Sequence, residues 1–190
     1  MTSAEATLLM GPWPGPLGGL PPYHLATPAA LEEAMHAAVA QRRAELAAIA
    51  ADPAPPTFAN TIEALEDSGR AVQHVQRLLR SVSTTGGTPE IAAVAQRLAP
   101  LAPPMHDEAA RDERLYARVE AVWQARHASG LDDEQIRLVE VLRNRLVRAG
   151  AGLDRAVGER LQAIQARLSE LATRFQQNLA ADETSQVVWL

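Results

Sequence analysis

PTFANTIEALEDSGRAVQHVQRLLRSVS, residues 56–83, is the stretch that decides the fold of this chain. Its large apolar residues recur at steps of three, four or seven, which is the spacing of a core-facing helical stripe. A second line of smaller groups runs beside them from Thr61 to Val82, and the polar residues fall on one remaining strip. Because so wide an apolar arc needs cover on more than one side, the pattern predicts one long helix inside a helical bundle. The stripe consists of Phe58, Ile62, Leu65, Gly69, Val72 and Leu79.

Two features qualify this helix. Pro55 and Pro56 cannot continue a preceding helix, and Thr57 can cap the new one through its hydroxyl. Gly69 costs about 1 kcal/mol relative to alanine in a helix interior. Two interpretations of Gly69 stay open: a tolerated weak point, or a place where another helix crosses too closely for a side chain.

The same stretch carries a family resemblance. Residues 56–66 read Pro-Thr-Phe-x-Asn-Thr-Ile-x-Ala-Leu-Glu, and residues 148–178 contain Arg-x-Gly-Ala-x-Leu, Arg-Leu-x-x-Ile and Phe-x-x-Asn in that order. This sequence resembles the N-terminal part of the M3 family of zinc metallopeptidases, above all its oligopeptidase A and peptidyl-dipeptidase branch. The resemblance covers nearly the whole chain from about Leu17. It implies an all-α N-terminal domain that walls a deep channel and limits entry to short peptides, with zinc held in a separate catalytic domain.

Composition agrees with a helical domain. The chain has 190 residues, of which 47% are hydrophobic and only 4% aromatic, and alanine is abundant. The net charge is −5, so nothing in the overall charge favours nucleic acid. There is no cysteine, which excludes disulfides and thiol catalysis. No apolar run approaches a membrane span and residues 1–10 lack a signal pattern, so we expect a cytoplasmic protein.

Three segments are expected along the chain. Residues 1–26 are a Pro/Gly-rich extended arm, since nine of the twelve residues from 11 to 22 are glycine or proline. Composition alone favours a disordered leader there, whereas the resemblance implies an arm lying across the catalytic part. Residues 27–183 form the helical domain. Residues 184–190 start a strand that leads, by the resemblance, into a catalytic domain absent from this chain.

The helical domain is expected to be a bundle of about five or six mostly antiparallel helices. Thr27-Pro28 and Thr88-Pro89 are each a cap followed by proline at the first helical position, and Asp132 with Gln135 forms a variant capping box. Besides the central helix, the expected helices run from Pro28 to Asp52, from Pro89 to near Leu101, from Glu113 to Ala128, from Asp132 to Gly150, and from Asp154 to about Leu179.

No residue of this chain is predicted to be catalytic, to bind a cofactor or to bind a metal. The M3 reaction needs H-E-x-x-H, which places two zinc ligands and a general base on one helix face. None of the five histidines is followed by glutamate and no two are four apart, so the resemblance assigns zinc to another part of the parent protein. These histidines are His24, His36, His74, His106 and His127.

Two weaker metal patterns are also interpreted as solvated. Glu33 and His36 have the E-x-x-H spacing of di-iron bundles, but the second motif and the inward carboxylates of such a site are missing. An acidic cluster surrounds one imidazole in a predicted loop after several prolines; it consists of His106, Asp107, Glu108, Asp112 and Glu113.

Partner surfaces complete the expectations. Trp123 is interpreted as core, while Trp13 and Trp189 are candidates for contact with a partner. The apolar row of the last helix and the VVWL end predict that the isolated chain self-associates or leaves both ends disordered. Two functions follow: the inactive, substrate-access domain of a zinc oligopeptidase whose partner is its own catalytic domain, or a free-standing helical interaction protein. The row consists of Val157, Leu161, Ile164, Leu168, Leu171, Phe175 and Leu179.

Overall fold

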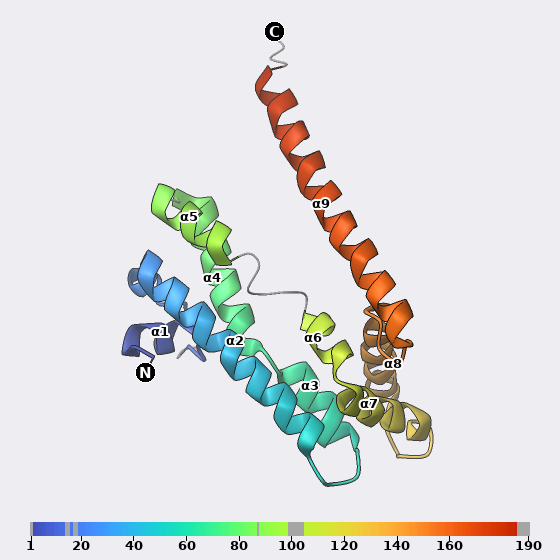
Figure 1. Ribbon diagram of the computed structural model, residues 1–190. Helices are drawn as coiled ribbons and strands as arrows, with labels where there is room; N and C mark the ends of the chain where they lie inside the picture. The colour runs from blue at the N-terminus through green and yellow to red at the C-terminus, as the bar shows by residue number, and fades with distance from the viewer. Residues whose placement is uncertain (1, 14–15, 17–18, 87, 99–104, 186–190) are drawn as a thin grey trace. The chain divides into compact units, whose positions relative to one another are not determined.

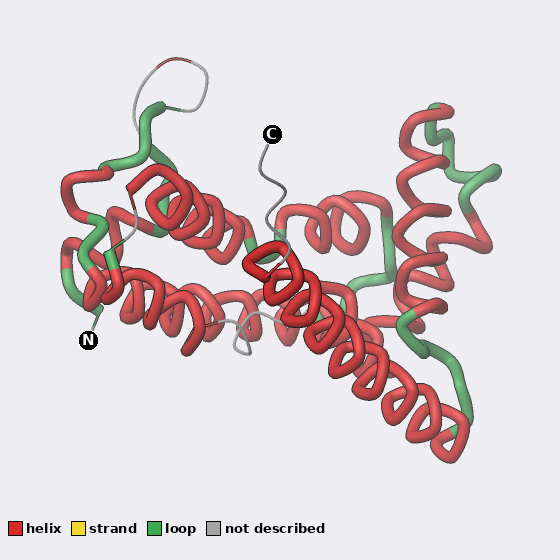
Figure 2. Tube along the Cα trace, turned by 90° about the horizontal axis from the view of Figure 1, so that it is seen from above, coloured by secondary structure: helices red, strands yellow, loops and turns green. Residues whose placement is uncertain are grey.

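The computed structural model describes residues 2–13, 16, 19–86, 88–98 and 105–185, and within these ranges all regular structure is helical (Figures 1 and 2). The all-α prediction is confirmed. The chain divides into two compact units, Met1–Ala151 and Gly152–Leu190. The α-helices are α1 (Ala4–Leu9), α2 (Pro28–Ala51), α3 (Ala64–Asp67), α4 (Arg70–Gly86), α5 (Pro89–Leu98), α6 (Met105–Arg111), α7 (Glu113–Ala125), α8 (Asp133–Arg148) and α9 (Arg155–Ser185), with a 3₁₀ turn at Tyr23–Leu25 and a π-helical turn at Phe58–Glu63.

The first unit is built along α2, whose 24 residues span about 36 Å. The N-terminal half of α2 packs with α1, α4 and α5 around Leu31, Met35 and Val75, all at most 1% exposed. Its C-terminal half packs with the 58–67 segment, α6, α7 and α8 around a second hydrophobic cluster that includes Leu115 and Leu142. One long helix therefore joins two cores, and Figure 1 shows α4 running beside it.

The helix ends that carry cap signals are placed as expected. Thr27 Oγ1 accepts a hydrogen bond from Ala30 N at 3.2 Å, and α2 starts at the next residue, Pro28. Asp132 and Gln135 form the predicted capping box in both directions at the start of α8. These caps satisfy backbone N–H groups that have no partner inside the helix.

The prediction of one uninterrupted helix over residues 56–83 is wrong. The chain leaves the helical conformation at Ser68 and turns at Gly69, whose φ of 77° lies in the left-handed region that favours glycine. Ser68 Oγ donates to Leu65 O, and Gly69 N donates to Glu45 Oε2 of α2 at 2.8 Å. Gly69 is therefore a turn residue, and neither earlier interpretation describes it.

Two short helices also replace expected irregular segments. Within the arm predicted for residues 1–26, α1 is helical, and its Ala6 and Leu9 are fully buried in the first core. The acidic cluster predicted in a loop instead lies on α6 and the start of α7. Both helices are too short for a clear periodic signal.

The last helix is longer than expected, since α9 continues through residues 184 and 185, where the strand was to begin. The rest of that predicted strand, with Trp189, lies outside the described residues. None of the helices in the described ranges has the length and hydropathy needed to cross a bilayer.

Candidate functional site

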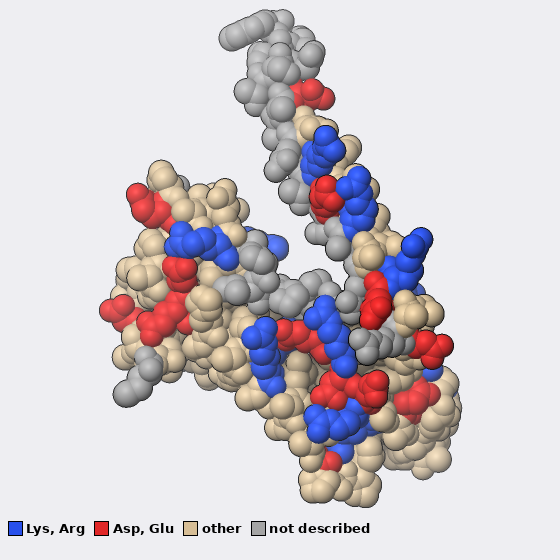
Figure 3. All heavy atoms as spheres, viewed as in Figure 1, with Lys and Arg blue, Asp and Glu red and all other residues tan. Residues whose placement is uncertain are grey.

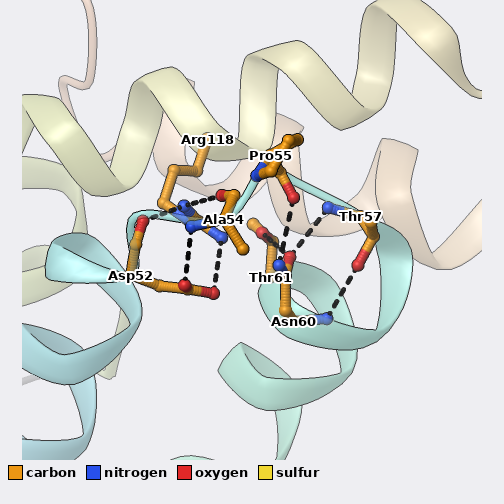
Figure 4. A network of polar contacts seen from close by, with 7 residues as sticks. All are labelled: Asp52, Ala54, Pro55, Thr57, Asn60, Thr61 and Arg118. Atoms are coloured by element: carbon orange, nitrogen blue, oxygen red, sulfur yellow. Dashed lines mark hydrogen bonds and ion pairs between the residues drawn. The ribbon is translucent and has the colours of Figure 1, made fainter.

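The signature segment 56–66 begins with a closed set of local hydrogen bonds (Figure 4). Thr57 Oγ1 accepts from Asn60 N at 3.1 Å, and Asn60 Oδ1 accepts from Thr57 N at 2.7 Å, which is a reciprocal capping box. Asn60 Nδ2 also donates to Pro55 O at 3.1 Å, and Thr61 Oγ1 donates to Asn60 Oδ1 at 2.9 Å. The Pro-Thr-Phe-x-Asn-Thr residues thus fix the chain at a sharp entry into the helix.

Arg118 of α7 holds the other side of this corner (Figure 4). Its Nη1 donates to Asp52 O at 2.7 Å and to Ala54 O at 3.0 Å, and its Nη2 pairs with Asp52 Oδ2 at 3.2 Å. The loop contains Pro53 and Pro55, which have no N–H, so its carbonyl oxygens need donors from elsewhere. A buried guanidinium supplies several in one plane. We define these contacts of Asp52, Ala54, Pro55, Thr57, Asn60, Thr61 and Arg118 as the proline corner.

A second polar network joins α7 and α8. Glu120 Oε2 accepts from Arg143 Nε at 2.7 Å and from Tyr116 OH at 3.2 Å. Burial opposes ionisation of Glu120, but the hydrogen bonds from Arg143 and Gln124 and the Arg143 charge outweigh it, so the pKa of that carboxyl is lowered. Burial and the Glu120 charge raise the pKa of Tyr116, which stays a neutral donor. The network stabilises a helix pair and contains no free nucleophile.

Trp123 belongs to the same helix pair. It packs beside the second core but is only partly buried. The guanidinium carbons of Arg126 and Arg143 lie 4.2 and 4.0 Å from its ring centroid. Cation–π contacts of this kind stabilise the ring electrostatically as well as by packing. The prediction that Trp123 is a core residue is therefore confirmed in part: its side chain packs against the second core but is not fully buried.

The histidines are dispersed, as far as their side chains are described. His24, His36 and His127 are exposed. His74 Nδ1 lies 2.8 Å from Met10 O, and its ring contacts the Trp13 ring, with centroids 4.6 Å apart and planes tilted by 37°. Trp13, expected at a partner surface, therefore contacts its own unit, because the α1 helix brings it onto α4. For His106, only the helical backbone is described.

The two candidate acidic patterns have structural partners. Glu33 accepts hydrogen bonds from Ser3 Oγ at 2.8 Å and Ser3 N at 2.6 Å, and these bonds lower the pKa of its carboxyl. It therefore anchors α1 instead of only facing solvent. In the second pattern, Glu108 pairs with Arg43 at 3.2 Å, and Asp112 Oδ1 caps α7 by accepting from Leu115 N at 3.2 Å. Within the described part of the chain, no three His, Asp or Glu side chains are grouped to hold a metal.

The surface also carries an apolar hollow of about 380 Å³ among α2, α4 and α5. Its lining combines leucine, methionine and alanine side chains with those of Arg80, Gln76 and Ser83. Such a lining can accept an apolar group. The Arg80 guanidinium stays protonated and cannot activate Ser83 as a general base, and the Ser83 hydroxyl donates to Leu79 O at 2.7 Å.

The described residues thus define a helical domain whose conspicuous sequence motifs serve its own architecture. No protein-family model matches the chain. It is 37% identical over 145 residues to the dipeptidyl carboxypeptidase of Escherichia coli (strain K12), a match covering 76% of this chain and 21% of that protein. The dipeptidyl carboxypeptidase of Salmonella typhimurium (strain LT2) is 36% identical over 143 residues, or 75% of this chain and 21% of the relative.

The chain is therefore related to the dipeptidyl carboxypeptidases over about three quarters of its own length, and it spans about a fifth of theirs. The resemblance to a peptidyl-dipeptidase branch is confirmed at the level of these relatives.

Proposed function

We propose that this chain is the N-terminal, substrate-access domain of a zinc peptidase that resembles the dipeptidyl carboxypeptidases. The observation that carries the proposal is the 37% identity over 145 residues with a relative of which those residues make up only 21%. In this proposal, the hydrolytic zinc site belongs to a separate catalytic domain, and this chain contributes walls that select short peptides.

The contacts of the first unit support a wall. Arg118 of the proline corner ties α7 to the loop that follows α2, and Glu45 ties α2 to the turn at Gly69. Buried or partly buried polar contacts of this kind make relative movement of the helices costly. A rigid wall can exclude bulky peptides without contributing to bond cleavage.

A domain swap tests the proposal. The matched region of the E. coli relative is replaced by the corresponding residues of this chain, and release of C-terminal dipeptides is measured over a series of blocked peptides of increasing length and bulk. The expected result is zinc-dependent release with kcat/KM altered most for the longest and bulkiest peptides. A folded, zinc-loaded chimera with an unchanged selectivity profile would contradict the access role.

The isolated 190-residue chain provides the matched control. It is expected to release no dipeptide from the same peptides, with or without added zinc, because the proposed function assigns hydrolysis to another domain. Zinc-dependent release by the isolated chain would contradict that assignment.

A free-standing helical interaction protein is the second candidate function, and the exposed apolar row of α9 favours it. On that account, a folded chimera would lose peptidase activity regardless of peptide length, while the isolated chain would bind another helix.

A further inference from the structure

Helix α9 presents a long apolar seam to solvent. Six of its large apolar side chains are between 43% and 63% exposed. Single exposed leucines are common on protein surfaces, but contiguous rows of exposed apolar side chains are not. From Val157 to Phe175, the spacing is 4-3-4-3-4, which is the a/d spacing of a heptad and covers about 27 Å of helix. The six are Val157, Ile164, Leu168, Leu171, Phe175 and Leu179.

One edge of this seam is lined by an arginine row. Arg160, Arg167 and Arg174 are seven residues apart and exposed, and each directly precedes an a-position residue, so all three occupy heptad g positions. Figure 3 shows basic side chains spaced along α9. The opposite edge, the e positions before Leu179, contains no charge: Gly158, Gln165 and Ala172 occupy it.

The acidic residues near the row do not remove its charge pattern. Glu159 and Glu170 occupy f and c positions, on the outer side of the helix. Arg167 Nη1 pairs with Glu170 Oε2 at 2.6 Å, but both side chains are more than half exposed. Exposed pairs of this kind are weak and readily exchanged for another carboxylate.

We infer that this face of α9 docks an amphipathic helix of another protein segment, one that carries carboxylates along the edge facing the arginine row. The apolar seam supplies the contact area, and the row selects acidic over basic partners. The inference goes beyond the proposed function and does not depend on it, because it concerns the chain by itself.

A second copy of this chain satisfies the seam but not the charges. In an antiparallel pair, g positions face g positions, so the two arginine rows would oppose each other. In a parallel pair, each g residue faces the e residue five positions later in the partner, which places Arg160, Arg167 and Arg174 opposite Gln165, Ala172 and Leu179. Neither arrangement supplies a carboxylate. A second copy of the chain, as in the self-association expected from sequence, is the competing occupant of the seam in the test below.

Two designed peptides test the inference. Both are four-heptad helices with isoleucine at a and leucine at d; one has glutamate at every e and g position, and the other has lysine. Binding of each fluorescent peptide to the full 190-residue chain is measured by anisotropy. The glutamate peptide is expected to bind at least about tenfold more tightly, because attraction at three pairs replaces repulsion. The chain's net charge of −5 would favour the lysine peptide, so non-specific attraction cannot produce this result.

Three variants locate the effect. The triple change Arg160→Glu, Arg167→Glu and Arg174→Glu is expected to invert the preference. A charge-matched control, Arg77→Glu, Arg80→Glu and Arg148→Glu, places the same charge change on α4 and α8 and is expected to keep the preference for glutamate. Leu168→Gln with Phe175→Gln is expected to abolish binding of both peptides, with helix content checked by circular dichroism. In about 1 M salt, where the Debye length is about 3 Å, the preference is expected to shrink.

Several results would overturn the inference. These are equal affinity for the two peptides, binding of neither peptide, or a preference that the arginine changes on α9 leave intact. A further contradicting result would come from sedimentation equilibrium. If the chain forms a dimer that the double change Leu168→Gln with Phe175→Gln dissociates, and the glutamate peptide does not compete with that dimer, a second copy of the chain occupies the seam.

Discussion

Helices α8 and α9 share an apolar periodicity but have opposite surroundings. The three stripe residues of α8 are at most 1% exposed, while the exposed row residues of α9 reach 63%. The charged residues differ in the same way: Arg143 of α8 meets Glu120 of α7 at 2.7 Å, whereas Arg167 of α9 is paired with Glu170 of its own helix. The α8 stripe consists of Val139, Leu142 and Leu146.

This difference shows that periodicity specifies a helix and its apolar face without specifying what covers that face. In α8, the cover is α7 and the second hydrophobic cluster. In α9, the face has the regularity of a coiled-coil seam, and the arginine row gives it a charge preference. The comparison can be tested by substitutions with known physical costs.

The largest expected effect comes from matched leucine truncations. Leu146→Ala removes a side chain with 0% exposure and is expected to lower the free energy of unfolding by about 3 kcal/mol, through lost burial and the cavity left behind. Leu168→Ala removes one that is 59% exposed and is expected to change it by less than about 0.5 kcal/mol. Urea unfolding followed by circular dichroism measures both. Equal losses would mean that the α9 seam is packed in the isolated chain.

The next effect concerns the proline corner. Arg118→Met keeps the long stem but leaves the Asp52 and Ala54 carbonyl oxygens without their donor, and is expected to cost about 2 kcal/mol. Arg114→Met removes a guanidinium that is 68% exposed and is expected to stay within about 0.5 kcal/mol of the parent. Indistinguishable unfolding curves for the two variants would contradict the claim that the Arg118 contacts of the proline corner stabilise the fold.

Glycine-to-alanine substitutions are expected to have smaller effects on stability, and these effects have opposite signs in the two units. Gly69→Ala places a side chain at a φ of 77° and is expected to destabilise the first unit by about 1 kcal/mol. At Gly158 of α9, an added Cβ meets no atom within 4 Å, so Gly158→Ala is expected to raise helix content with a local gain of about 1 kcal/mol. Circular dichroism and urea unfolding distinguish the two changes. A stabilising Gly69→Ala would contradict the turn at that residue.

The smallest effect is the acid dependence of the α7–α8 pair. Glu120 has a lowered pKa in the folded chain, so its ionised form contributes stability above its ordinary value of 4.5, and this contribution is lost as pH falls through the lowered value. Glu120→Gln is expected to flatten the decline of unfolding free energy below about pH 5. Arg143→Gln is expected to act in the same direction, because Arg143 favours the ionised carboxylate. A steeper acid decline in either variant would contradict the assigned sign.

Local sequence signals predict the helix ends well. Thr27 followed by Pro28, and Asp132 with Gln135, act through residues one to three positions away, so the pattern contains the whole interaction. The turn at Gly69 is missed because the apolar repeat continues across it. The deciding bond comes from Glu45 of another helix, 24 residues away.

The polar contacts are hidden from sequence for the same reason. Arg118 reaches Asp52 and Ala54 over more than 60 residues, and Glu33 reaches Ser3 over 30. The proline-rich loop does contain one usable signal, since carbonyl groups without neighbouring N–H groups require a donor. It cannot identify which of the eighteen arginines supplies that donor.

Hydrogen exchange with and without the glutamate peptide tests the central claim most directly. The claim is that the apolar face of α8 is packed within the chain, whereas that of α9 is exposed and binds an acidic helix. In the free chain, backbone amides of α8 are expected to exchange far more slowly than those of residues 157–179, since packing protects a helix more than its own hydrogen bonds do. The peptide is expected to slow exchange over residues 157–179 and leave α8 unchanged. Equal protection of both helices in the free chain, with no response to the peptide, would contradict the account.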